Sequence, residues 1–130
     1  MSKIMKKVKI LIFMLSLPLF SFAEVIDIKS AVVDANKTKR SIMLFLHRDG
    51  CSYCDKMIFQ LEEKEVAKAI EKDFILLDIN KDEDDTVIYK DFNGTNQKFL
   101  KTIGVEFYPS VIFINWCQKN SQQRKCYKIG

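Results

Sequence analysis

Two cysteines three positions apart, Cys51 and Cys54, stand between a short apolar run and a helix-like pattern. The run, residues 41–47, is almost continuously apolar, which is typical of a strand that is buried on both faces of a parallel or mixed sheet. An Asp-Gly pair at 49–50 ends the run, and from Cys54 onward apolar residues recur at positions i, i+3, i+4 and i+7. We therefore expect Cys51 to lie at the N-terminus of a helix that follows a buried strand.

A sulfur at a helix N-terminus meets unpaired backbone N–H groups and the positive end of the helix dipole. Both favour the thiolate, so we expect the pKa of Cys51 to fall below the value of about 8.5 for free cysteine. Cys54 lies one turn further on the same face, deeper, where it can close a disulfide with Cys51. The spacing predicts that Cys51 attacks a disulfide and that Cys54 resolves the mixed disulfide.

Other uses of such a cysteine pair need to be weighed. A c-type haem site requires a His directly after the second cysteine, but Asp55 stands there. A zinc site requires about four ligands, and the alternative set is Cys51 and Cys54 together with Cys117 and Cys126. A purely structural Cys51–Cys54 staple would close a very tight loop. Redox chemistry is the favoured interpretation; it needs no bound cofactor, and we assign no metal.

The first 23 residues have the pattern of a secretory signal peptide. Four lysines precede the apolar residues 10–22, a stretch shorter than the about 20 residues that span a bilayer. Small residues at Ser21 and Ala23 suit a signal peptidase, so we expect cleavage after Ala23 and no membrane anchor afterwards. The expected product is a periplasmic domain of residues 24–130, in a compartment that permits disulfides.

Charge gives no reason to expect a nucleic-acid partner. The chain carries 21 Lys and Arg against 17 Asp and Glu, but four of the lysines belong to the predicted signal. The remaining chain has no net formal charge and no basic block interleaved with aromatic residues. The acidic residues 80–85 lack the glycine and the distant glutamate of a calcium loop, so we interpret them as a solvated loop.

The rest of the pattern predicts one small α/β domain. Helices are expected at residues 25–40, with Asp27 or Ser30 as a cap, from the cysteines to 61, at 63–72 and at 95–103. Strands are expected at 41–47, 74–79 and 110–115, with a short strand or extended excursion at 86–92, a turn at Asn93-Gly94 and a return strand at 125–129. The order predicts a β-α-β crossover followed later by an antiparallel hairpin.

Cys117 and Cys126 flank the polar turn of the predicted final hairpin. Partners in neighbouring strands can bring their Cα atoms to about 5.5 Å, which is within the range of a disulfide. We expect a structural disulfide between these two cysteines. Free thiols and a second redox couple are the alternatives.

With these motifs the chain resembles the thioredoxin superfamily, above all the small exported thioredoxin-like proteins of the DsbD C-terminal-domain and SoxW kind. The resemblance covers about residues 42–115 and rests on the apolar strand before DGCSYCDKM, the helix after it, and GVEFYPSVIFIN. It implies an α/β thioredoxin-like fold, with a central mixed sheet flanked by helices. It also implies an exported thiol–disulfide oxidoreductase that reduces protein disulfides and exchanges electrons with a membrane or periplasmic redox partner. The alternative is a non-catalytic binding or zinc-binding module on the same scaffold.

The resemblance implies roles for two further residues. In the family a cis proline precedes the strand beside the cysteines, and Pro109 occupies this position. The residue before that proline offers its backbone to the substrate, which implies Tyr108 as a substrate contact. His47, four residues before Cys51, is a separate candidate because it is able to tune the thiolate or accept a proton. The alternative for His47 is a polar residue at a strand end.

The chain departs from thioredoxins proper at three points. Phe45 stands where they carry a buried Asp, and Ser52-Tyr53 stands where they carry Gly-Pro, so we expect a role other than that of a general thioredoxin. The sequence also stops at Gly130, before the helix that closes the family fold. We therefore expect the final helix to be missing, with sheet surface left exposed, as in a truncated product.

Overall fold

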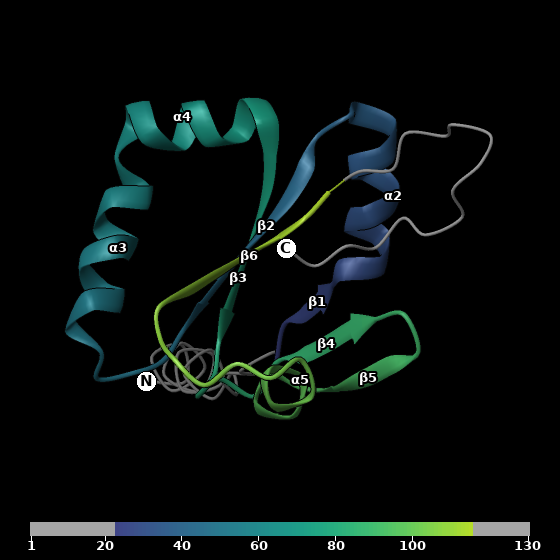
Figure 1. Ribbon diagram of the computed structural model, residues 1–130, viewed down its shortest axis with the longest axis vertical. Coiled ribbons are helices and arrows are strands. Elements are labelled where there is room, and N and C mark those ends of the chain that lie inside the picture. The colour runs from purple at the N-terminus through teal and green to yellow at the C-terminus, as the bar shows by residue number, and fades with distance from the viewer. Residues whose placement is uncertain (1–22, 116–130) are drawn as a thin grey trace, which may run out of the picture.

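The computed structural model describes residues 23–115, in which strands and helices are arranged in layers (Figure 1). In chain order the elements are β1 (Val25–Asp27), α2 (Ile28–Thr38), β2 (Ser41–His47), α3 (Ser52–Glu62), α4 (Lys64–Asp73), β3 (Phe74–Asn80), β4 (Thr86–Tyr89), β5 (Phe92–Thr95), α5 (Asn96–Thr102) and β6 (Ser110–Ile114). Four predictions lie outside the described residues: the signal peptide, the return strand at 125–129, the Cys117–Cys126 disulfide and the missing final helix.

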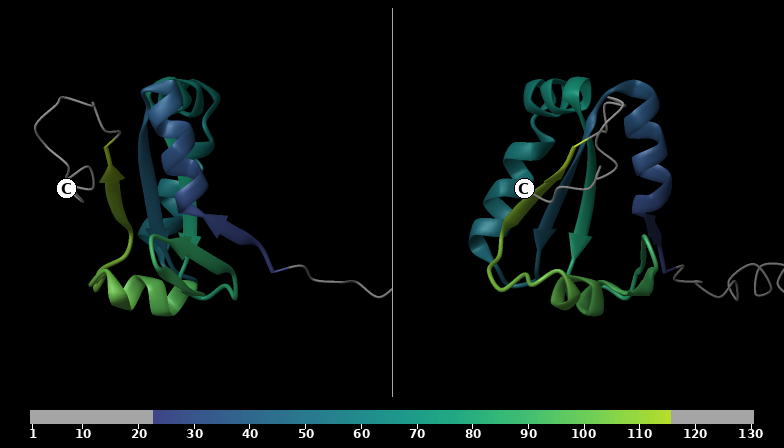
Figure 2. Two further views of the ribbon diagram at one scale, coloured as in Figure 1. Left: turned by 90° about the vertical axis from the view of Figure 1, so that its right-hand side faces the viewer. Right: turned by 45° about the vertical axis from the view of Figure 1, so that its right-hand side comes forward.

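β2 is the middle strand of a three-stranded mixed sheet with the order β3-β2-β6. It runs parallel to β3, with Ser41 opposite Phe74, and antiparallel to β6. The parallel pair is connected through α3 and α4, as the sequence predicts. α2 lies on one side of this sheet, and α3 and α4 lie on the other (Figures 1 and 2). The expected α/β class, with a mixed sheet flanked by helices, is confirmed.

A second, smaller sheet has the order β1-β4-β5. Its first strand corrects the prediction of a helix from residue 25, because residues 25–27 pair in parallel with β4. The helix instead begins at Ile28, since the Asp27 carboxylate caps it by accepting hydrogen bonds from the Ser30 backbone N–H at 2.9 Å and from its hydroxyl at 2.7 Å. Both hydrogen bonds lower the pKa of Asp27 below its ordinary value, and the bond from the backbone N–H has the larger effect.

The turn predicted at Asn93-Gly94 is wrong, because the β4–β5 hairpin turns at residues 90–91 and Gly94 lies within β5. The reason is packing: the Phe92 ring contacts the ring of Phe99 in α5, with 5.4 Å between centroids, which keeps Phe92 in a strand. A Cβ added at Gly94 would lie 2.9 Å from the Phe92 ring. Glycine at this position therefore makes room for an aromatic ring and does not form a turn.

The core explains why β2 is a continuous apolar run. Alternate residues of a strand point to opposite faces. Ile42, Leu44 and Leu46 are at most 2% exposed and pack in one cluster with α2 residues. Met43 and Phe45 are also buried, so both faces of the strand are covered, as the run predicts.

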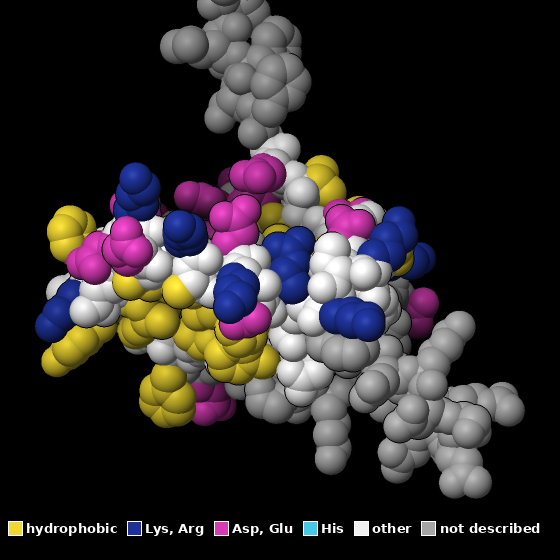
Figure 3. Space-filling view, turned by 90° about the horizontal axis from the view of Figure 1, so that it is seen from above, with side chains coloured by type: hydrophobic (Ala, Val, Ile, Leu, Met, Phe, Trp, Pro, Cys, Tyr) yellow, Lys and Arg dark blue, Asp and Glu magenta, His cyan; other side chains and the backbone are white. Residues whose placement is uncertain are grey.

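The side of the sheet that carries α3 and α4 is covered less completely. Leu76 of β3 and Phe113 of β6 remain 39% and 37% exposed, and Phe59 of α3 is 69% exposed. Seen from above, hydrophobic side chains gather on the left of the molecule, which is the side of α3 and α4 (Figure 3). Within residues 23–115, no helix has both the length and the apolar character needed to cross a membrane.

Candidate active site

The connection from β2 to α3 places Cys51 where the sequence predicts it. Gly50 adopts a positive φ of 64°, a backbone conformation that glycine takes at no steric cost. Cys51 is then the N-cap residue of α3, and its Sγ accepts a hydrogen bond from the backbone N–H of Cys54 at 3.2 Å. The sulfur therefore faces an N–H group that the helix leaves without a backbone partner.

Cys51 and Cys54 form a disulfide, with their Cα atoms 5.2 Å apart. The two residues differ in access: Cys51 is 7% exposed, whereas Cys54 is fully buried in the first turn of α3. A reagent that approaches the disulfide from solvent therefore meets the Cys51 sulfur first.

The segment before β6 lies against the Cys51 sulfur. The Tyr108–Pro109 peptide bond is cis, the form that the sequence resemblance implies. The backbone oxygen of Tyr108 lies 3.9 Å from Cys51 Sγ, although the two residues are 57 positions apart in the sequence. Partial burial raises the pKa of the Tyr108 phenol above its ordinary value, and the nearby Asp82 carboxylate adds to this effect. The residue that the resemblance implies as a substrate contact thus borders the Cys51–Cys54 pair.

His47 is buried at the end of β2, and its Nε2 pairs with the carboxylate of Asp78. Its ring also stacks on Phe45, with 5.0 Å between centroids. Asp78 lies directly opposite Phe45 in the parallel register of β2 and β3. Sequence reasoning missed Asp78, because its partner is 31 positions away and only the strand register joins them. Phe45 occupies the position at which thioredoxins proper carry an Asp. A carboxylate does lie beside this position, but it belongs to Asp78 of the neighbouring strand.

The acidic residues 80–85 hold the loop that precedes Cys51, so their interpretation as merely solvated is incomplete. Asn80 donates from Nδ2 to the Asp49 carboxylate at 2.9 Å, and its side-chain oxygen accepts from the Asp82 backbone N–H at 3.0 Å. The Asp82 carboxylate in turn accepts from the Asp49 backbone N–H at 2.9 Å. Within residues 23–115, no group of three or more His, Cys, Asp or Glu residues is placed to hold a metal ion.

Replacing Asn80 by Ala is expected to destabilise the protein by about 1–3 kcal/mol. The buried Asn80 side chain donates one hydrogen bond to the Asp49 carboxylate and accepts one from the Asp82 backbone N–H, and the variant loses both. Urea denaturation of both proteins measures the change. Asn93→Ala is the matched control, because Asn93 is exposed on β5. An equal loss of stability in the two variants would contradict a role for Asn80 as the clamp of this loop.

A family model described as thioredoxin-like matches residues 24–115. Among solved structures, the chain is similar to a thioredoxin-fold protein from Helicobacter pylori, at 20% identity and a TM-score of 0.51, over 75% of this chain and 60% of that one. It is also similar to a thioredoxin from Thermus thermophilus, at 21% identity and a TM-score of 0.48, over 70% and 63% of the two chains. The chain thus spans about three fifths of the length of these two proteins. None of the curated proteins matches it.

Proposed function

This chain belongs to the thioredoxin-like family, whose model matches residues 24–115, and on that basis we propose that it reduces protein disulfides in the periplasm through Cys51 and Cys54. One observation carries the proposal. The Cys51 sulfur is the side-chain cap of α3, bonded to the buried Cys54 and bordered by the backbone of Tyr108. Such a sulfur is favoured as a thiolate when the disulfide is reduced.

The reaction begins with the reduced pair. The Cys51 thiolate attacks one sulfur of a substrate disulfide, the substrate S–S bond breaks, and the departing substrate sulfur takes up a proton. Cys54 then gives up its proton and attacks Cys51 Sγ, which releases the second substrate sulfur as a thiol. The Cys51–Cys54 disulfide of the structure is the product, so two electrons have passed to the substrate. A dithiol redox partner at the membrane or in the periplasm restores the reduced pair.

Neighbouring residues receive finer roles in this proposal. Tyr108 and Pro109 contact the extended backbone of the substrate beside the attacked sulfur. His47 lies four residues before Cys51, is buried, and pairs with Asp78. In this proposal it tunes the reactive sulfur or accepts a proton, since histidine changes its charge near neutral pH. Tyr53 precedes Cys54 in the sequence, and Phe107 precedes Tyr108. Their rings are 77% and 78% exposed, so they are available to apolar substrate side chains. The reducing direction of this proposal follows from the sequence resemblance to the small exported thioredoxin-like proteins of the DsbD C-terminal-domain and SoxW kind.

Two measurements test the proposal. The protein, supplied with dithiothreitol, is expected to accelerate insulin reduction, measured as turbidity from the precipitating B chain. The potential of the Cys51–Cys54 pair is expected near the value of about −270 mV that is typical of a thioredoxin-like reductant. A potential near about −120 mV would instead indicate an oxidant. An absence of turnover together with stoichiometric zinc would indicate a binding module.

A further inference from the structure

The outer edge of β3 lacks a strand partner among the described residues. β3 pairs with β2 along all of Phe74–Asn80, while β1, the other strand near this edge, pairs with β4. Within residues 23–115, the Phe74 N–H donates to the Ile70 carbonyl of α4, and no element other than β2 forms a hydrogen bond with the backbone of residues 75–79. Unpaired N–H and C=O groups along an edge strand form a template for another strand.

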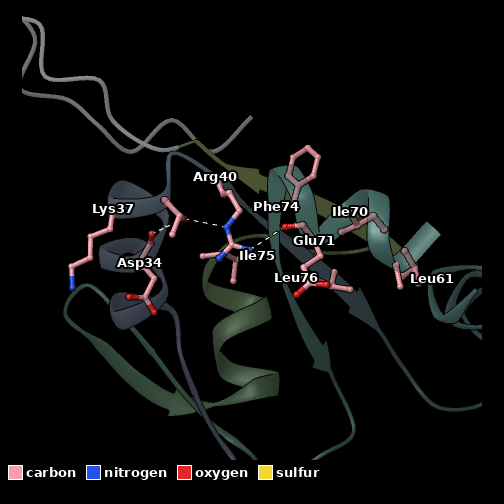
Figure 4. Close-up of a pocket in the computed structure, with 11 residues that line it drawn as sticks. Asp34, Lys37, Arg40, Leu61, Ile70, Glu71, Phe74, Ile75 and Leu76 are labelled. Atoms are coloured by element: carbon pink, nitrogen blue, oxygen red, sulfur yellow. Dashed lines mark hydrogen bonds between the residues drawn. The ribbon is translucent and has the colours of Figure 1, made fainter. Parts of the chain in front are cut away.

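An apolar hollow of about 460 Å³ lies beside the first half of this edge. Figure 4 shows Phe74, Ile75 and Leu76 of β3 between Arg40, which follows α2, and Ile70 and Glu71 of α4. Arg40 spans the hollow, because it donates to the Thr38 hydroxyl and to the Glu71 backbone oxygen, both at 3.1 Å. The walls are therefore fixed to each other, and a hollow of this size accommodates apolar side chains.

An acidic hollow of about 380 Å³ lies beside the second half of the edge. Leu76 lines both hollows, so the two adjoin along β3. Carboxylates line the second hollow, namely Glu24, Asp27, Asp78, Glu83 and Asp85. Desolvation and the neighbouring Asp85 and Asp78 carboxylates raise the pKa of Glu83, which agrees with a concentration of negative charge. His47 is the one basic side chain in this lining.

We propose that the β3 edge and these two hollows bind an extended segment of a partner protein, which adds as a strand to β3. Backbone hydrogen bonds to residues 75–79 supply the recognition common to strand addition. An apolar side chain of the segment enters the hollow at Leu76, and a Lys or Arg nearby in the segment lies against Glu83 and Asp85. The groove contains neither Cys51 nor Cys54, so this inference does not rest on the proposed redox function.

Two blocked peptides without cysteine test the proposal: acetyl-VLVKTK-amide and its acidic counterpart acetyl-VLVETE-amide. Nitrogen-15 NMR of the protein is expected to show the basic peptide shifting the amides of residues 75–79 and slowing the hydrogen exchange of those that do not donate to β2. The acidic peptide is expected to bind at least about fivefold more weakly, because carboxylates line one end of the groove. N-methylation of alternate peptide amides is expected to abolish binding, since it removes the donors that a strand requires.

Two charge-reversal variants of the protein test where the basic side chain of the bound peptide lies. Glu83→Lys is expected to weaken the basic peptide about tenfold, whereas Asp84→Lys, an exposed neighbour outside the hollow, changes its affinity less than about twofold. The proposal is overturned if the basic peptide fails to bind at millimolar concentration, or if the N-methylated peptide binds as well as its parent. It also fails if the two variants weaken binding equally. Protection, before peptide is added, of those amides of residues 75–79 that do not donate to β2 would mean that another segment or a second copy already occupies the edge, which equally rejects it.

Discussion

Replacing Cys51 by Ser is expected to lower the rate of insulin reduction at least about a thousandfold, the scale seen when a catalytic nucleophile is removed. A hydroxyl at this position keeps the hydrogen bond from the Cys54 N–H but cannot form a disulfide, so the first step of the exchange is lost. The initial rate of turbidity, at equal protein and dithiothreitol concentrations, measures the effect.

Cys54→Ser separates the two proposed roles. This variant is expected to retain the first attack but to stop at the mixed disulfide, because the sulfur that resolves it in the proposed reaction has been removed. Mass spectrometry under non-reducing conditions should find up to one substrate chain per molecule, attached at Cys51. An adduct at Cys54 in the Cys51→Ser variant, formed at the same rate, would reverse the assignment of attacking and resolving cysteine.

The matched control replaces both other cysteines, in the double variant Cys117→Ser, Cys126→Ser. We expect it to reduce insulin at the rate of the unmodified protein, whether or not these two cysteines form the predicted structural disulfide. A loss comparable to that of Cys51→Ser would support a second redox couple, one of the alternatives that the sequence offers.

The sequence predicted the position of the two cysteines at the start of a helix well, because that position depends on local patterns. The apolar run 41–47 is β2 with the same bounds, and Cys51 caps the helix that the i, i+3, i+4 pattern predicts. Each of these signals is contained in about a dozen consecutive residues, where strand and helix periodicity alone decide the outcome.

The surroundings of the pair were harder to predict because they depend on strand register and packing. The contacts of His47 with Asp78 and of Asn80 with Asp49 each join residues 31 positions apart, and both follow from the parallel alignment of β2 with β3. The family resemblance implied Tyr108 as a substrate contact, but its position, 3.9 Å from Cys51 Sγ, follows only from the fold. The Asn-Gly signal failed because packing of Phe92 on Phe99 outweighed a local turn preference.

Phe99→Ala should produce the largest loss of stability among the variants considered, about 3–5 kcal/mol. Phe99 is 2% exposed in α5, and its ring lies 6.0 Å from that of Tyr89 and 5.4 Å from that of Phe92, measured between centroids. Truncation would leave a cavity between α5 and the β4–β5 hairpin, which packing relaxes only partly. Since the free energy of unfolding of a small domain is only about 5–15 kcal/mol, this loss is a large share of the total stability.

Urea denaturation measures this loss as a shift of the transition midpoint. The dependence of the unfolding free energy on urea concentration is expected to stay unchanged. Phe107→Ala removes the same ring from a position that is 78% exposed, and is expected to change stability by less than about 0.5 kcal/mol. Equal losses in the two variants would show that Phe99 does not support the core as its burial indicates. Because Phe99 packs on the hairpin, whereas Cys51 caps α3, the folded fraction of Phe99→Ala should still carry out thiol exchange. Loss of stability and loss of chemistry are therefore separable in this fold.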